Sequence, residues 1–184
     1  MNKKGFTLIE LLIVIGILAI LTAAVVIVLN PAELLKQARD SQRLTDLDAM
    51  KNAIALYVAD ATTPNIGAAT TCYAYAGAPA TSACGARFTT ATTVGSASTT
   101  KAVDGTGWIP VNLASMASGS PLSALPVDPS HGATYYYAYA ASTTSLTFEI
   151  NAVLESTKFG PKMLSDGGNS DTLYEVGSYP GLSL

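Results

Sequence analysis

Residues 3–10 read Lys-Lys-Gly-Phe-Thr-Leu-Ile-Glu and open an apolar run that continues to Leu29. From Leu11 onward the run contains only apolar residues, one glycine and one threonine. Its length is close to the ~20 residues that a helix needs to cross a bilayer. The run therefore predicts a membrane-spanning helix at residues 6–29, and the rest of the chain follows it as a separate region.

One carboxylate, that of Glu10, lies just inside this apolar run. A glutamate costs about 2.5–3.5 kcal/mol at a membrane centre on insertion scales, and less near the edge. If the chain is cut after Gly5, Phe6 becomes a charged amino terminus, and Glu10 follows it by about one helical turn. The Phe6 amine and the Glu10 carboxylate can then pair within one chain or between staggered chains. Between staggered chains, one offset pairs both charges and other offsets leave a charge unpaired.

The sequence Lys-Lys-Gly followed by Phe-Thr-Leu-Ile-Glu-Leu-Leu resembles the class III signal of type IV pilins and of type II secretion pseudopilins. The resemblance covers about residues 1–30. It implies that a prepilin peptidase removes the leader, residues 1–5, by cleaving between Gly5 and Phe6, and that Phe6 is then N-methylated. It also implies assembly into a helical filament, with Glu10 as the assembly glutamate. The expected partners are further copies of this chain, the peptidase and methyltransferase, an inner-membrane assembly platform and, before assembly, membrane lipid.

The apolar run has two plainer interpretations. It could be a secretory signal cut near Ala23, or a permanent signal anchor. The run is long for a secretory signal, whose apolar region spans about 7–15 residues. Neither interpretation needs Gly5 or Glu10, so both are less favoured.

The length and net charge of the chain limit the number of domains and the kinds of partner. A chain of 184 residues allows one anchor and one modest domain. The net charge of −3 lacks the positive field that gives affinity for nucleic acid, so a nucleic-acid partner is unsupported. Basic residues flank the span on both sides, so the cysteine pair and the resemblance decide the orientation. We expect a single-pass precursor in the cytoplasmic membrane with its N-terminus inside and residues 30–184 outside, and afterwards a surface filament.

A second helix is predicted at residues 30–60. Asn30-Pro31-Ala32-Glu33 combines a capping residue, a proline suited to the first helical position and a glutamate three residues after the cap. The anchor helix is therefore expected to bend or break near Pro31. Apolar residues at steps of three and four predict a stripe that packs on a sheet, and charged residues are expected outside it. The stripe is Leu44, Leu47, Met50, Ile54, Tyr57 and Val58; the outer residues are Arg43, Asp46, Asp48 and Asp60.

Residues 61–107 are rich in Ala, Thr, Ser and Gly, which predicts a loop with short strands at most. In the pilin family this segment is the variable loop after the long helix. It contains both cysteines, Cys72 and Cys84. In an exported domain a disulfide is favoured over two free thiols, and a zinc site with His131 is improbable.

Residues 108–184 are expected to form a small antiparallel sheet and a C-terminal loop. Segments 108–111 and 125–127 indicate short extended pieces, and Asp128-Pro129-Ser130-His131-Gly132 indicates a turn. Residues 135–140 predict a strand with alternating tyrosines, and a turn at 141–144 leads into a second strand at 145–155. That second strand is expected to point Phe148 and Ile150 inward, and Glu149, Asn151 and Glu155 outward. Residues 173–176 predict a last short strand.

The chain carries no catalytic motif, and we expect no enzymatic activity. His131 is its single histidine and is expected in an exposed turn. The loop Asp166-Gly167-Gly168-Asn169-Ser170-Asp171 offers oxygen ligands of the kind that Ca²⁺ prefers, and loosely resembles the calcium loop of major pseudopilins. We therefore predict a calcium site at Asp166, Asn169 and Asp171, with an ordinary polar turn as the alternative.

These features together predict an α+β protein with the type IV pilin fold. The leading functional hypothesis is a major pilin, a structural subunit of a type IV pilus. The second is a major pseudopilin of type II secretion, favoured by the Leu-Pro-x-Asp-Pro segment that begins at Leu125. The third is a membrane-anchored binding or enzymatic domain that uses a pilin-like signal only for export.

Overall fold

The structure is a computed structural model that describes residues 5–78, 82–89, 91–95 and 98–178. The chain divides into two compact units, residues 1–36 and 37–184, which are described separately here. The first unit is helical and the second combines helix and sheet, so the α+β prediction is confirmed. Residues 1–4 of the expected leader lie outside the described residues.

The first unit contains α1, Leu8–Leu29, and the start of α2, Pro31–Asp60. Asn30 separates them with a left-handed backbone, φ 39°. Its carbonyl accepts the N–H of Glu33 at 3.0 Å and of Leu34 at 3.3 Å, so Asn30 ends one helix and starts the next. The predicted break near Pro31 is confirmed, and it falls one residue earlier because proline fits the first position of the new helix.

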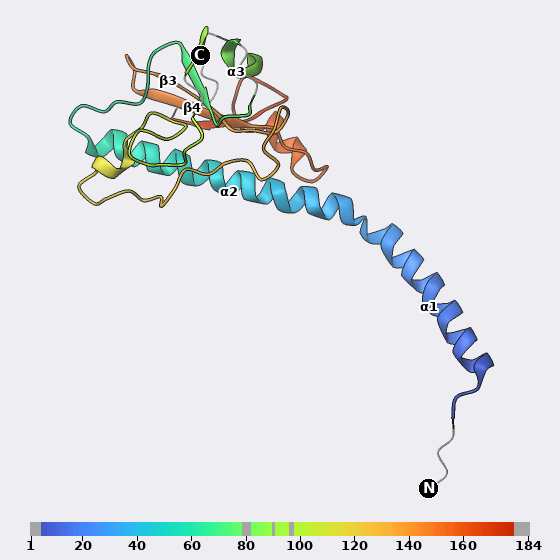
Figure 1. The fold of residues 1–184 in the computed structure, drawn as a ribbon. Coiled ribbons are helices and arrows are strands. Elements are labelled where there is room, and N and C mark those ends of the chain that lie inside the picture. The colour runs from blue at the N-terminus through green and yellow to red at the C-terminus, as the bar shows by residue number, and fades with distance from the viewer. Residues whose placement is uncertain (1–4, 79–81, 90, 96–97, 179–184) are drawn as a thin grey trace. The chain divides into compact units, whose positions relative to one another are not determined.

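The second unit is built on a five-stranded sheet (Figure 1). In spatial order the strands are β2 (Thr93–Val94), β1 (Thr71–Ala74), β3 (Ala138–Ser142), β4 (Thr147–Ala152) and β5 (Tyr174–Gly177). The pair β1–β2 is parallel and the other pairs are antiparallel. Residues 61–107, predicted as a loop with short strands at most, supply two short strands and also a short helix, α3 (Ser82–Ala86). Two 3₁₀ turns complete the unit, Leu113–Ser115 and Gly160–Leu164.

The predicted hairpin forms with shifted ends. β3 begins at Ala138 rather than at residue 135, because the carbonyl of Tyr135 accepts the N–H of Gly132 and closes the preceding turn. The connecting turn is residues 143–146. The alternation of the tyrosines is confirmed, since Tyr137 and Tyr139 join the core on one face and Tyr136 lies in the cluster on the other.

One face of the sheet forms the main core with α2 (Figure 1). From α2, Leu47, Met50 and Ile54 are fully buried in this core, as the spacing predicted. Phe148 and Ile150 contribute from β4. The segments around Trp108 and Leu125 fill the same core without joining the sheet. Irregular backbone can be buried here because its polar groups bond locally; the carbonyl of Pro126, for example, accepts from the Trp108 indole at 3.0 Å.

The opposite face of the sheet was expected to meet solvent, and that prediction is wrong. Glu149 and Asn151 are 1% and 0% exposed. A second, smaller cluster covers this face, formed by Cys72, Cys84, Phe88, Ala91, Tyr136, Ala138 and Ala140. Cys72 and Cys84 form a disulfide that ties the covering segment to β1. The alanine side chains of β3 are short, so this segment can approach the sheet closely, and α3 lies on the face away from α2 (Figure 1).

Arg43 was expected outside the helix stripe and is instead fully buried. Its Nε and Nη2 donate to the two carboxylate oxygens of Asp128 at 2.8 and 3.0 Å. Its Nη1 donates to Asp40 at 2.7 Å and to Glu155 at 2.8 Å. The prediction was wrong because helical spacing could not show that Asp128 and Glu155, from distant segments, meet Arg43 and its neighbour Asp40 there.

Glu155 was also expected to point outward, and its side chain is only 7% exposed. Nε and Nη2 of Arg39 donate to the two carboxylate oxygens of Glu155 at 2.6 and 2.8 Å. The hydrogen bonds from Arg39, together with Arg43, lower the pKa of Glu155 to about 2. Asp40 accepts the N–H groups of Glu155 and Ser156. The ionic cluster therefore links the segment that follows β4 to the part of α2 around Asp40.

Candidate assembly and processing site

The first turn of α1 is closed by a reciprocal pair of side chains, Thr7 and Glu10. Thr7 is the N-cap, and its Oγ1 accepts the N–H of Glu10 at 3.3 Å. Oε2 of Glu10 accepts from the Thr7 N–H at 2.8 Å and from the Thr7 hydroxyl at 2.7 Å. This is a capping box, which satisfies helix N–H groups that have no partner within the helix. The acidic group also suits the positive end of the helix dipole.

Phe6 lies before the cap rather than in the first turn. The sequence suggested that the Phe6 amine and Glu10 could face each other within one helix. In the uncleaved chain Glu10 instead bonds to Thr7, and Gly5 and Phe6 are exposed and lie outside any helix or strand. Phe6 is 83% exposed, and a methyl group added at Gly5 would meet no atom within 4 Å. The expected cleavage bond is therefore exposed and lies before the first helix.

The surface of α1 is apolar all round. None of its residues is buried, and apolar side chains of the helix such as Leu8 and Val28 are about four-fifths exposed. Its one hydroxyl, that of Thr22, donates to the Leu18 carbonyl at 2.7 Å, which satisfies it within the helix. Among the described residues, this is the one helix long and apolar enough to cross a membrane. Such a surface needs lipid or other apolar helices around it.

The remaining predicted site residues lie in the second unit. His131 lies in the predicted turn, but it is half-buried rather than exposed. Its Nε2 lies 2.9 Å from the carbonyl of Ala76, and its ring meets Tyr75 edge-on at 5.2 Å. The turn residue Asp128, which was not singled out as a site, holds Arg43.

The predicted calcium loop is ordered by its own hydrogen bonds. Asp166 accepts the N–H groups of Gly168 and Glu175 at 2.9 and 2.8 Å, one on each carboxylate oxygen. Within the described part of the chain, no group of three or more His, Cys, Asp or Glu residues could hold a metal ion. Calcium binding at Asp166, Asn169 and Asp171 stays a prediction from the sequence pattern.

Glu149 and Glu175 form a buried acidic pair that sequence reasoning missed. They lie diagonally across the β4–β5 pairing, and each has one buried oxygen, Oε2 and Oε1 respectively, without a hydrogen-bond partner among the described residues. Burial raises the pKa of Glu149, and the neighbouring Glu175 carboxyl raises it further. Burial also raises the pKa of Glu175. The strand pairing puts both residues on one face, and the loop at residues 166–170 packs against Glu175 through the Ser170 N–H and the backbone of Gly168.

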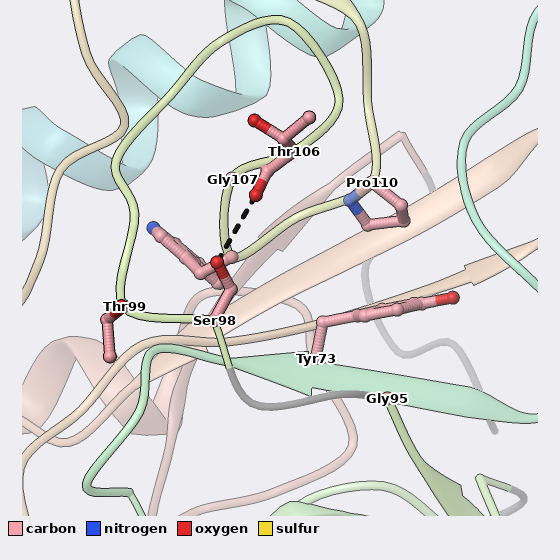
Figure 2. Close-up of a pocket in the computed structure, with 8 residues that line it drawn as sticks. Tyr73, Gly95, Ser98, Thr99, Thr106, Gly107 and Pro110 are labelled. Carbon is pink, nitrogen blue, oxygen red and sulfur yellow. Dashed lines mark hydrogen bonds between the residues drawn. The ribbon is translucent and has the colours of Figure 1, made fainter.

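A cavity of about 610 Å³ opens on the second unit between β1 and the segment around Trp108 (Figure 2). Its lining is Tyr73, Gly95, Ser98, Thr99, Thr106, Gly107, Trp108 and Pro110. The hydroxyl of Ser98 donates to the Thr106 carbonyl at 3.2 Å, so it stabilises the wall. The phenol of Tyr73 is the one titratable group of the lining, and it accepts the Ala68 N–H at 3.0 Å. This lining provides no acid–base pair.

Comparison with known families identifies the N-terminal segment. Residues 1–26 match the family described as the prokaryotic N-terminal methylation motif. This motif is the class III signal of type IV pilins and pseudopilins, so the sequence resemblance is confirmed over that segment. No curated protein and no solved structure matches the chain. The motif therefore supports a pilin-type or pseudopilin-type precursor, fits a membrane-anchored one, and implies processing by a prepilin peptidase and pilus assembly.

Proposed function

We propose that the chain is a structural subunit that polymerises into a type IV pilus filament after cleavage between Gly5 and Phe6. One observation carries this proposal: a wholly exposed apolar helix carries a single carboxylate, Glu10, in its first turn. Lipid can cover the helix in the precursor, and copies of the same helix can cover it in a filament. Anchoring and assembly then use the same surface at different times.

Glu10 supplies the register of the polymer. In the precursor its Oε2 is held by Thr7, and no described residue donates to its Oε1. Cleavage creates a positive amine at Phe6, which is then N-methylated. In a helical stack the amine of one chain can reach Glu10 of its neighbour. Other offsets leave a carboxylate unpaired among apolar side chains, which is strongly unfavourable.

Charge and capping can be separated by three substitutions. Glu10→Gln keeps an acceptor for the capping box but removes the charge. Thr7→Ala removes the cap and keeps the charge, and Glu10→Ala removes both. If Glu10 pairs with an amine, both Glu10 variants fail to form filaments, whereas Thr7→Ala still forms them. The measurement is electron microscopy of surface filaments, with immunoblots to check that each precursor is present and cleaved.

The opposite pattern would reject the pairing. If Glu10→Gln assembles normally and Thr7→Ala does not, Glu10 serves only to cap the helix. If Glu10→Ala leaves every function intact, the chain is better explained as an anchored domain that uses the signal for export.

A pseudopilin of type II secretion is the second candidate. The segment from Leu125 to Tyr139 favours it by its similarity to the segment that leads into the sheet of major pseudopilins. Deletion of the gene separates the candidates. Loss of surface filaments supports the pilin, and loss of secreted enzymes from the medium with filaments retained supports the pseudopilin.

A further inference from the structure

Arg87 extends from the segment that covers the second face of the sheet and reaches a cavity of about 450 Å³. Its guanidinium stacks on the ring of Tyr136, with the central carbon 3.4 Å from the ring centroid. The Tyr136 hydroxyl donates to the Cys84 carbonyl at 2.7 Å, which fixes the ring to the disulfide-bonded segment. Arg87 is therefore held in one orientation beside the cavity.

Only part of the donor capacity of this guanidinium is used. Nη1 donates to the Tyr136 carbonyl at 2.6 Å and to Oδ1 of Asn151 at 3.4 Å, which uses both of its hydrogens. Nη2 donates once, to the Thr134 carbonyl at 2.9 Å. Neither Nε nor the second hydrogen of Nη2 donates to any described residue. An arginine carries five N–H donors, so two remain, one on Nε and one on the adjacent Nη2.

The other two arginines show what this edge binds in the same protein. Arg39 uses Nε and Nη2 to hold both oxygens of Glu155, and Arg43 uses the same two atoms to hold both oxygens of Asp128. Such fork-shaped pairing is the preferred way for arginine to bind a carboxylate or a phosphate. Arg87 is the one arginine whose fork meets no acidic side chain among the described residues.

The surroundings of Arg87 leave its charge without a close counter-ion. Asn151 bridges Arg87 to Glu149, whose Oε1 accepts from Nδ2 of Asn151 at 3.1 Å. Burial raises the pKa of Glu149, so this carboxyl is a weak source of negative charge. Burial also lowers the pKa of Arg87, which shows that the charged form is poorly solvated. A bound anion would relieve this cost.

We propose that the cavity beside Arg87 binds an oxyanion, a carboxylate or a phosphate group, through Nε and Nη2. The hydroxyls of Ser170 and Thr172 also line the cavity, lie 3.1 Å from each other and supply further donors. This site is separate from the assembly helix and does not depend on the proposed polymer. It gives the extracytoplasmic unit a specific affinity for small acidic molecules or for acidic groups carried on larger ones.

The chain's three arginines make a direct test possible. In full-length ¹⁵N-labelled protein in neutral detergent micelles, each arginine gives one Nε–H resonance. Inorganic phosphate and, separately, acetate are titrated at constant pH against sodium chloride of equal ionic strength. We expect the Arg87 resonance to shift saturably, with a dissociation constant on the order of millimolar. The resonances of Arg39 and Arg43 are internal controls, because carboxylates already fill their forks.

The two anions distinguish the chemical source. A response to phosphate alone indicates a phosphorylated ligand, a response to acetate alone indicates a carboxylate, and a response to both defines a general oxyanion site. The proposal is overturned if phosphate and acetate each shift the Arg87 resonance no more than sodium chloride does. A shift of all three resonances together, which would indicate non-specific screening, also overturns it.

A pair of variants tests the fork itself. Arg87→Lys keeps the positive charge but removes the planar pair of donors, and Lys101→Gln removes an exposed charge that does not line this cavity. We expect Arg87→Lys to weaken the phosphate-dependent rise in melting temperature roughly fivefold or more, and Lys101→Gln to leave it unchanged. The unshifted Arg39 and Arg43 resonances show whether Arg87→Lys is folded. Equal responses of the folded Arg87→Lys variant and the wild type would contradict the proposal.

Discussion

Charged and apolar side chains are arranged in opposite ways in helix α1 and in the unit that contains the ionic cluster around Arg43. In α1 every apolar side chain is exposed and the one charge is held by a single threonine. The second unit has a buried apolar core, and its Arg43 is enclosed by three carboxylates. This difference distinguishes a cluster that stabilises the fold from a helix whose surface must contact other molecules. The cluster is satisfied within the chain, whereas α1 is complete only when another molecule surrounds it.

The largest expected effect concerns Gly5, after which the proposed cleavage occurs. Gly5→Val should abolish cleavage, because the motif implies that the peptidase requires this glycine. The Phe6 amine then never forms, and no filament assembles. Mass spectrometry of the purified protein should find the N-terminus intact.

Gly16→Val is the matched control for that substitution. Gly5 and Gly16 both have open space where a side chain would begin, so neither change creates a steric clash within the chain. Normal cleavage of Gly16→Val, with none of Gly5→Val, would assign the effect to recognition by the peptidase. Equal cleavage of both variants would refute the prediction.

Next in size is the loss of the central charge of the ionic cluster. Arg43→Met leaves three buried or half-buried carboxylates without their shared partner, and should lower the free energy of unfolding by about 3–5 kcal/mol. Arg39→Met removes a side chain that is 33% exposed and should cost about 1 kcal/mol or less. Chemical denaturation of the two full-length variants in micelles measures both. Similar losses of unfolding free energy in the two variants would mean that burial does not determine how much each ion pair stabilises the fold.

A smaller effect, of defined sign, comes from Glu149. Its pKa is raised in the folded state, so the folded protein holds a proton that the unfolded chain releases above pH 4.5. The wild type should therefore lose stability as the pH rises from about 4.5 through neutrality. Glu149→Gln cannot ionise and should be more stable than the wild type at pH 8, by on the order of 1–3 kcal/mol, with the difference vanishing near pH 4.

Glu155→Gln is the control of opposite sign. The folded-state pKa of Glu155 is lowered to about 2, so its ion pairs stabilise the fold above pH 4.5 and are lost as the pH falls toward 2. This variant should be less stable than the wild type at pH 7, and the gap should close in acid. Melting temperatures measured from pH 3 to pH 8 test both variants, and parallel pH profiles for the two would contradict the assignment.

The smallest effect lies at the junction of α1 and α2. Asn30 has a left-handed backbone, which costs most residues about 1–2 kcal/mol but asparagine and glycine less. Asn30→Ala should therefore destabilise the junction by about 1 kcal/mol, and Asn30→Gly should not. Hydrogen exchange of the Leu34 amide, which donates to the Asn30 carbonyl, reports this locally. Equal exchange in the two variants would exclude a role for the left-handed conformation.

Local patterns predicted most of the elements. The bounds of α2 follow from the cap at Asn30 and the apolar spacing, and β4 follows from the alternation around Phe148 and Ile150. The position of the short strand β1 was not predicted because its residues, Thr-Cys-Tyr-Ala, are few and surrounded by loop-like composition. Its place in the sheet depends on pairing with β3, more than sixty residues away.

The sequence by itself determined the processing motif, the apolar span, the place of Glu10 and the helix break, because each depends on neighbours within a few turns of chain. Only the tertiary structure decided which polar residues are buried. Arg43 and Glu149 were expected on the surface, yet Arg43 is enclosed by three carboxylates and Glu149 is buried beside a second acid. Arg87, which no sequence pattern singled out, keeps two N–H donors unused by the described residues beside a cavity. Burial and charge pairing depend on which distant segments cover a face, and no local pattern carries that information.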